Sequence, residues 1–188
     1  VGKRPVMFFD GDLWSLRKWD ADKIIGSGAF MAVHDSAVWN CHTFCHHDSH
    51  KNGLDPIRYF NSGLMFWDNR IAEHREIFKL ARQSHQEHKR GKRHYDDKTD
   101  QAHLNYGVLH SGVPLQWLPI QYNTYCFGIN HGQFPYYPRD IINLHGAGIA
   151  PKRKFSRLRI EASVFGQKIF PLHQQAVNFE WDRMFSYR

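Results

Sequence analysis

Short apolar runs that alternate with helical patterns are the feature that most constrains the fold of this chain. The runs have the length of buried strands and fall at residues 5–9, 29–33, 57–60, 64–67, 115–118 and 141–144. Between them, one predicted helix begins at an Asp68 N-cap and ends near Gly91, and a second runs from Thr99-Asp100 to about Leu109. Strands that alternate with helices predict an α/β layer fold. Because no internal repeat or linker interrupts the pattern, residues 1–188 are predicted to form a single domain.

Polar triplets follow two of these runs directly. Asp10-Gly11-Asp12 comes after residues 5–9, and Asn61-Ser62-Gly63 separates residues 57–60 from 64–67, where a tight turn or a β-bulge is expected. Carboxylates at the carboxyl end of a strand in an open α/β sheet lie where such folds bind ligands. Oxygen ligands of this kind suit magnesium or manganese. The same carboxylates could also cap a helix or solvate a turn, so the pair alone leaves the three interpretations open.

Composition and charge narrow the class of protein. The net charge of +7 is concentrated in residues 88–94 and 152–159, and both segments would attract polyanions. No zinc-finger spacing, RNP-type signature or helix-turn-helix pattern accompanies them, so no specific nucleic-acid binding is expected. No apolar run approaches the roughly 20 residues that span a bilayer, and no transmembrane segment is predicted. Three cysteines are too few for a disulfide framework, which favours a cytoplasmic over a Golgi-lumenal location.

A cluster of cysteines and histidines occupies residues 41–50. Its members that could bind zinc include Cys41, Cys45, His46, His47 and His50. Zinc sites usually pair two short ligand couples across a longer loop, whereas this segment holds one cluster, so an exposed loop near an acceptor entrance is the alternative. The remaining histidines, among them His85, His88 and His103, are predicted to be surface residues.

Four motifs in order carry a resemblance to a known family. They are FFDGDLW, YFNSGLMFWD, DDKTDQAHLNY and NLHGAGIAPK. Their order and approximate spacing resemble those of family 8 glycosyltransferases, the group of glycogenin and the bacterial lipooligosaccharide galactosyltransferases. The resemblance covers residues 5–152. It implies a GT-A-type nucleotide-diphospho-sugar transferase fold, with a mixed central sheet flanked by helices. It also implies an enzyme that transfers a sugar from a nucleotide-sugar donor, most often a UDP-sugar, with retention at the anomeric carbon.

The resemblance assigns roles to charged and metal-ligating residues. Asp10, Asp12 and His145 would hold Mn²⁺, or Mg²⁺, against the donor diphosphate. Gly148 and Lys152 would contact and neutralise the departing phosphate. Read without the family pattern, His145 is a partly buried histidine that ends the strand at 141–144. The family signature places a lysine at position 151, where this chain has proline, and Lys152 follows by one residue.

Other assignments concern the transferred sugar. Asn61 and Gly63 would line the donor-sugar pocket, while Asp100 and Gln101 would contact the sugar hydroxyls and the reacting face. Asp100 could equally be a first-turn helix residue that interacts favourably with the helix dipole. The acceptor is expected to be a carbohydrate, a glycolipid or a protein, and the sequence does not select among them.

The start of the chain departs from the family pattern. Residues 5–9 correspond to an interior strand of the family fold, so the chain is expected to be the C-terminal portion of a GT-A domain, with a missing segment or a partner chain pairing with this strand and supplying the nucleobase site. Residues 153–188 have no assigned role. Two other classes of function stay open at this point: a catalytically inactive relative that binds carbohydrate or protein, and a basic scaffold.

Overall fold

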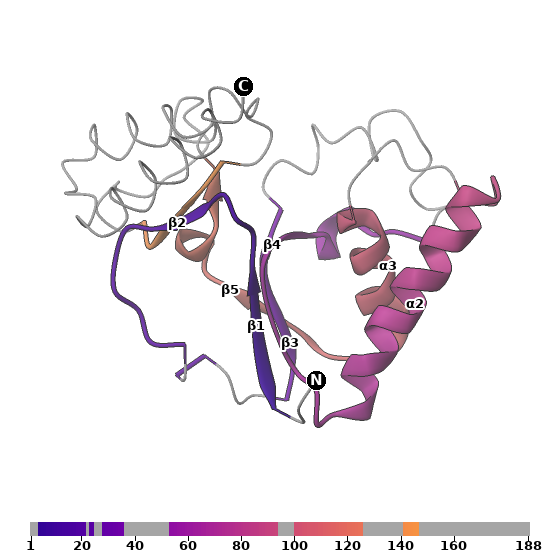
Figure 1. Cartoon of the computed structure of the whole chain (residues 1–188), viewed down its shortest axis with the longest axis horizontal. Coiled ribbons are helices and arrows are strands. Elements are labelled where there is room, and N and C mark those ends of the chain that lie inside the picture. Colours follow the sequence, from indigo (N-terminus) through magenta and orange to yellow (C-terminus); the bar gives the residue numbers. More distant parts are fainter. Residues whose placement is uncertain are drawn as a thin grey trace, which may run out of the picture. The chain divides into compact units, whose positions relative to one another are not determined.

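The structure is a computed structural model that describes residues 4–21, 23–24, 28–35, 53–93, 100–125 and 141–146 (Figure 1). Their elements fall into two compact units. One holds a four-stranded sheet with the two long helices, and the other holds a three-stranded sheet. The single-domain prediction for residues 1–188 stays a prediction. Among the described helices, none is long and apolar enough to span a bilayer.

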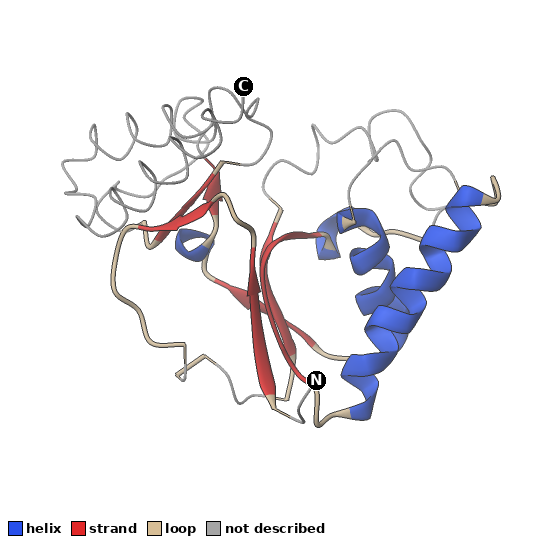
Figure 2. Cartoon of the chain, viewed as in Figure 1, coloured by secondary structure: helices blue, strands red, loops and turns tan. Residues whose placement is uncertain are grey.

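The four-stranded sheet is mixed. Its spatial order is β1 (Pro5–Phe9), β4 (Phe60–Asp68), β3 (Phe30–His34) and β5 (Leu115–Leu118). Strand β4 runs antiparallel to both β1 and β3, and β5 runs parallel to β3. Strands β1 and β3 therefore run in the same direction, and the residues that follow them, Asp10 and Asp35, lie at the same end of the strands. Figure 2 shows both helices on one face of this sheet.

A β-bulge interrupts the pairing of β3 with β4. Ala32 pairs with Met65, and the next residue, Val33, pairs with Asn61. The bulge alternative for Asn61-Ser62-Gly63 is therefore confirmed, and the tight turn is wrong, because β4 continues through all three residues. The predicted strand at 57–60 is wrong for residues 57–59, and Phe60 is the first residue of β4. Ile57 is 73% exposed in the 3-10 helix η2 (Pro56–Arg58), whose first turn is capped by the Asp55 side chain.

The two helices begin and end close to the predicted positions. Helix α2 (Ala72–Lys89) starts four residues after Asp68, so the predicted Asp68 N-cap is wrong. Asp68 instead ends β4, where its carboxylate accepts the Arg70 N–H at 2.8 Å. Helix α3 (Gln101–Ser111) has Asp100 at its N-cap position and ends at Gly112, whose φ of 75° is left-handed. The core lies between these helices and the sheet, and its buried members include Phe30, Phe60, Met65, Ile77, Ala81, Leu104 and Val108.

The second unit contains two strands, β2 (Leu13–Ser15) and β6 (Thr124–Tyr125), that the sequence did not predict. Strand β2 pairs with β7 (Asn143–His145), which in turn pairs with β6. A short 3-10 helix, η3 (Ile120–Tyr122), precedes β6. The predicted strand at 141–144 is thus displaced toward the C-terminus and includes His145. Ser15 Oγ donates to Asn143 Oδ1 at 2.6 Å, and this cross-strand bond helps to fix the register.

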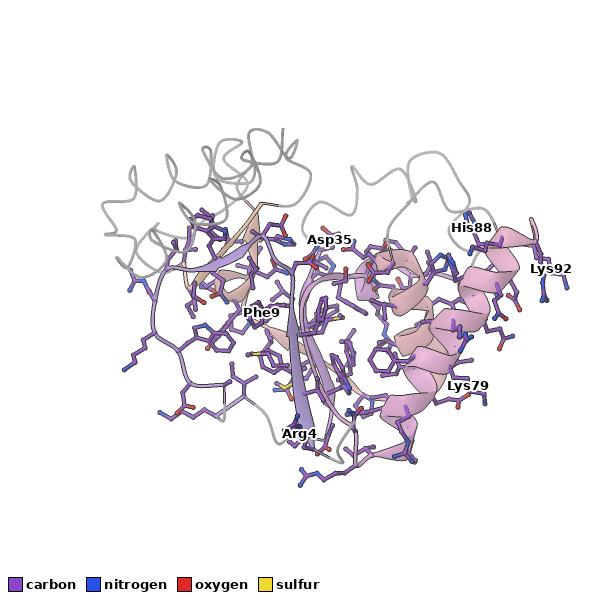
Figure 3. The ribbon with its side chains drawn as sticks, in the orientation of Figure 1. Arg4, Phe9, Asp35, Lys79, His88 and Lys92 are labelled. Atoms are coloured by element: carbon purple, nitrogen blue, oxygen red, sulfur yellow. The ribbon has the colours of Figure 1, made fainter. Side chains whose placement is uncertain are left out.

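Strand β1 forms one edge of the four-stranded sheet as described. Its last residue, Phe9, is 53% exposed, and Phe8 is also exposed. Figure 3 labels Phe9 on this strand. An apolar edge strand of this kind is open to pairing with a further strand.

Candidate metal and donor site

Asp10 and Asp12 lie in the turn that joins β1 to β2. The Asp10 N–H donates to the Gly63 carbonyl at 2.9 Å, which extends the pairing of β1 with β4 by one residue. The Asp12 carbonyl accepts the Gly146 N–H at 3.0 Å, which extends the pairing of β2 with β7. Backbone hydrogen bonds thus fix both residues, and the intervening Gly11 has open space around it.

His145 is a buried histidine held in one tautomer. Its side chain is 2% exposed, and its Nδ1 lies 2.8 Å from Asn123 Oδ1. An amide oxygen only accepts, so Nδ1 carries a proton, and in the neutral ring Nε2 carries the lone pair. That Nε2 lies 3.3 Å from Asp12 Oδ1. This contact is favourable with a cation beside both atoms, or with a second proton on Nε2 that would pair the ring with Asp12.

The three residues predicted as metal ligands converge. Asp10, Asp12 and His145 each offer one ligand atom, and these atoms all lie within 4.8 Å of one another. Two ligand atoms that bind one ion at about 2.1 Å, with a right angle at the ion, lie about 3 Å apart. This separation is close to the 3.3 Å between His145 Nε2 and Asp12 Oδ1. Two carboxylates with one imidazole suit manganese better than magnesium. The donor set therefore fits a divalent ion.

Gln101, the first residue of α3, is held by both ends of its amide. Its Oε1 accepts from Asn61 Nδ2 at 2.9 Å and from the Ser62 N–H at 3.1 Å. Its Nε2 donates to Asp35 Oδ2 at 2.7 Å. Asp35 is 3% exposed, and a carboxylate can only accept. The amide orientation of Gln101 is therefore fixed by charge as well as by geometry.

The bulge in β4 is held by α3 and by its own side chains. Asn105 pairs with Phe60, accepting its N–H and donating to its carbonyl, both at 2.8 Å. Asn61 Oδ1 accepts the Gly63 N–H at 2.9 Å. The Gly63 carbonyl in turn accepts from Asp10. A chain of hydrogen bonds thus runs from Gln101 through Asn61 and Gly63 to the backbone of Asp10.

Asp35 and Asn123 are site residues that sequence reasoning missed. Asp35 carried a usable signal, since it follows the apolar run at residues 29–33 much as Asp10 follows the run at 5–9. Figure 3 labels Asp35 at the end of β3. No local pattern marks Asn123, which reaches His145 only through the pairing of β6 with β7.

Other predicted site residues stand apart from these contacts or outside the described residues. Asp100 is exposed at the N-cap position of α3, and its side chain makes no capping hydrogen bond. Gly148 and Lys152 lie outside the described residues, as do the Cys41, Cys45, His46 and His50 cluster and residues 153–188.

Solved glycosyltransferases share this fold. The galactosyltransferase LgtC, solved in complex with donor and acceptor sugar analogs, superposes with a TM-score of 0.56 at 16% identity, over 87% of this chain and 61% of the LgtC chain. The bifunctional glycosyltransferase WbbM superposes with a TM-score of 0.55 at 18% identity, over 78% of this chain and 29% of WbbM. This chain therefore spans about three fifths of the length of LgtC.

The similarity defines a fold. No family model and no curated protein sequence matches the chain. The mixed sheet, its flanking helices and the two superpositions show that the chain has the GT-A glycosyltransferase fold, so the fold expected from the four motifs is confirmed.

Proposed function

We propose that this chain supplies the metal-binding and sugar-binding residues of a retaining glycosyltransferase that uses a UDP-sugar as its nucleotide-sugar donor and a carbohydrate, glycolipid or protein as its acceptor. The observation that carries the proposal is the convergence of Asp10, Asp12 and His145. Residues more than a hundred positions apart in the sequence supply one set of ligands that suits a divalent ion. The ordered resemblance to family 8 and the GT-A fold support the same conclusion.

The ligands have distinct tasks in this proposal. Asp10 and Asp12 supply negative charge to attract the ion, and Asn123 keeps the Nδ1 proton of His145 in place so that Nε2 can ligate. Outer hydrogen bonds of this kind orient a metal-binding imidazole and raise its basicity. When bound, the ion supplies Lewis-acid stabilisation of the diphosphate leaving group.

Gln101 is the residue that we place against the donor sugar. Its amide is held by Asn61, Ser62 and Asp35, so little reorganisation is needed when the sugar binds. Dipoles fixed in advance stabilise developing charge more effectively than groups that must reorient. Asn61 and Gly63 line the same pocket in this proposal, and the exposed Asp100 would contact a sugar hydroxyl once a donor is present.

The departing diphosphate needs a positive partner. In the proposal, Gly148 and Lys152 take this role. It rests on the resemblance alone, because both residues lie outside the described part of the chain. A cytoplasmic location is likewise proposed from the low cysteine count.

Donor turnover tests the proposal. The protein is incubated with Mn²⁺ and a panel of UDP-sugars without acceptor, and released UDP is measured against time. We expect slow hydrolysis of at least one donor, loss of this activity on chelation, and a decrease of at least about a hundredfold in Asp12→Asn. Asp20→Asn is a matched control, because Asp20 is a half-exposed carboxylate outside the ligand group.

Two results would contradict the proposal. UDP release equal in Asp12→Asn and wild type would assign the activity to another site or to a contaminant. No turnover of any donor, together with retained metal-dependent sugar binding, would favour the inactive carbohydrate-binding relative.

A further inference from the structure

Three histidines lie together where α2 packs against α3. His85 and His88 lie one turn apart on the same face of α2, and His103 lies in the first turn of α3. The ring centre of His103 is 4.9 Å from that of His85 and 5.7 Å from that of His88. The prediction that these histidines are surface residues is wrong for His103, which is buried. Figure 3 labels His88 near the C-terminal end of α2.

The spacing of the rings matches that of imidazoles around one metal ion. His85 Nδ1 lies 3.3 Å from His103 Nε2. Two nitrogens bound to one tetrahedral zinc ion at about 2.1 Å lie about 3.4 Å apart, and their ring centres lie about 5 Å apart. Without an ion, these two nitrogens must share one proton. With an ion, both can direct a lone pair at it.

Hydrogen bonds select the tautomers that ligation requires. His88 Nδ1 lies 2.9 Å from the Arg93 carbonyl, which only accepts, so Nδ1 carries the proton and Nε2 the lone pair. His103 Nδ1 lies 3.2 Å from Ser84 Oγ, and a hydroxyl there can accept the Nδ1 proton. His88 and His103 are thus oriented from outside, as metal-binding histidines commonly are.

Of the positive charges near the three histidines, that of Arg93 is held in an ion pair, while Lys89, Arg90 and Lys92 are exposed. Arg93 Nε lies 2.6 Å from Glu87 Oε2, and Arg93 Nη2 donates to the Tyr106 hydroxyl at 2.8 Å. The guanidinium also lies 4.1 Å from the centre of the Tyr106 ring. Arg93 therefore contributes its carbonyl to His88 while its charge is balanced by Glu87.

We infer that His85, His88 and His103 bind a late first-row divalent cation, with Zn²⁺ as the representative. Neutral imidazoles favour zinc, copper and nickel over manganese and magnesium, so this site differs in preference from the Asp10, Asp12 and His145 group. It also differs in readiness: among the described residues the Asp-Asp-His group alone has three ligand atoms within 4.8 Å, so at least one of the three histidine rings must move before one ion can bind all three.

A bound ion would cross-link α2 to the first turn of α3. His103 lies two residues after Gln101, so this cross-link would stabilise the end of α3 that carries Gln101. A ligand that binds only the folded state raises its stability by mass action. The inference stands on these contacts and does not depend on the proposed transferase activity.

Zinc binding by a restricted background variant tests the inference. The background carries Asp12→Asn, Cys41→Ser and Cys45→Ser, which weaken the other two candidate metal sites of the chain. Zn²⁺ is titrated calorimetrically into this protein, and thermal unfolding is followed with and without Zn²⁺. Cu²⁺ is then added at one equivalent, and its electron paramagnetic resonance spectrum reports nitrogen ligands.

We expect one zinc ion per chain, a higher midpoint of unfolding with zinc, and nitrogen hyperfine structure from more than one imidazole on copper. Adding His85→Ala should weaken zinc binding at least tenfold and remove the thermal shift, and His88→Ala should act in the same direction. Because His85 is exposed, its replacement should leave the fold intact, which circular dichroism checks. His110→Ala is the matched control on α3. Equal zinc affinity in the background, His85→Ala and His110→Ala variants, or no zinc binding in the background, would overturn the inference.

Discussion

Replacing Gly107 with alanine is expected to destabilise the protein, although alanine is the better helix former. Gly107 lies in α3 where it crosses α2. A Cβ at this position would lie 2.3 Å from the Ile77 carbonyl oxygen and 3.1 Å from its carbonyl carbon. The first distance is 1.1 Å short of the 3.4 Å at which ordinary contact begins. The obstructing atoms are backbone, so no rotamer change relieves the clash and the helices must separate.

The magnitude follows from two opposing effects. Alanine gains about 1 kcal/mol in helix propensity over glycine. Overpacking a close contact costs roughly 1–3 kcal/mol, and a clash with backbone belongs at the upper end of that range. We therefore expect a net loss of about 2 kcal/mol in the free energy of unfolding. Separation of the helices should also displace Gln101 at the start of α3 and lower donor turnover.

Urea unfolding followed by far-ultraviolet circular dichroism measures the loss. Gly112→Ala is the matched control, because a Cβ added at Gly112 would have nothing within 4 Å. This substitution should cost roughly 1 kcal/mol, which comes from the left-handed backbone alone. The m-values should be unchanged, so that the midpoint shift reports stability. A Gly107→Ala protein as stable as wild type would refute the close crossing of α2 and α3.

Three further predictions concern single side chains. Burial lowers the pKa of His74, whose Nδ1 accepts the Asp68 N–H at 2.8 Å and whose Nε2 faces the Gly28 carbonyl. Because the unfolded state takes up the proton first, the free energy of unfolding should fall as the pH drops below about 6.5. Denaturation of wild type and His74→Gln at several pH values should show a weaker pH dependence in the variant. Asp35→Ala should lower donor turnover by about tenfold or more, with UDP binding changed much less, because it frees the Gln101 amide; steady-state kinetics and calorimetry that show equal losses would contradict this. Asn123→Ala should weaken Mn²⁺ binding by about 10- to 100-fold, and unchanged affinity in a metal titration would show that the tautomer of His145 is set by another group.

Strand and helix patterns predicted most of the first unit. The runs at 29–33 and 115–118 appear as β3 and β5, displaced by at most one residue. The errors arose where local chemistry permitted two structures. Asp68 is a good capping residue, but its carboxylate instead closes a turn onto Arg70. Strand β2 is three residues long, too short to show any period.

Contacts between distant segments were the hardest to predict. The sequence alone favoured a strand-end role for His145, and only the resemblance to a family joined it to Asp10 and Asp12. Helix α3 is buried on most sides, by α2 and by β4, so its polar residues carry no amphipathic pattern. His103 was therefore predicted to be exposed, although it is enclosed between Ser84 and His85.

Manganese titration is the most direct test of the central claim, that Asp10, Asp12 and His145 form a metal site for a nucleotide diphosphate. Electron paramagnetic resonance measures free Mn²⁺ as the ion is added to wild type and to Asp12→Asn, each with and without UDP. The account predicts one Mn²⁺ bound per wild-type chain, tighter binding when UDP is present, and at least a tenfold weaker affinity in Asp12→Asn. Identical titration curves for the two proteins, with no effect of UDP on either, would contradict it.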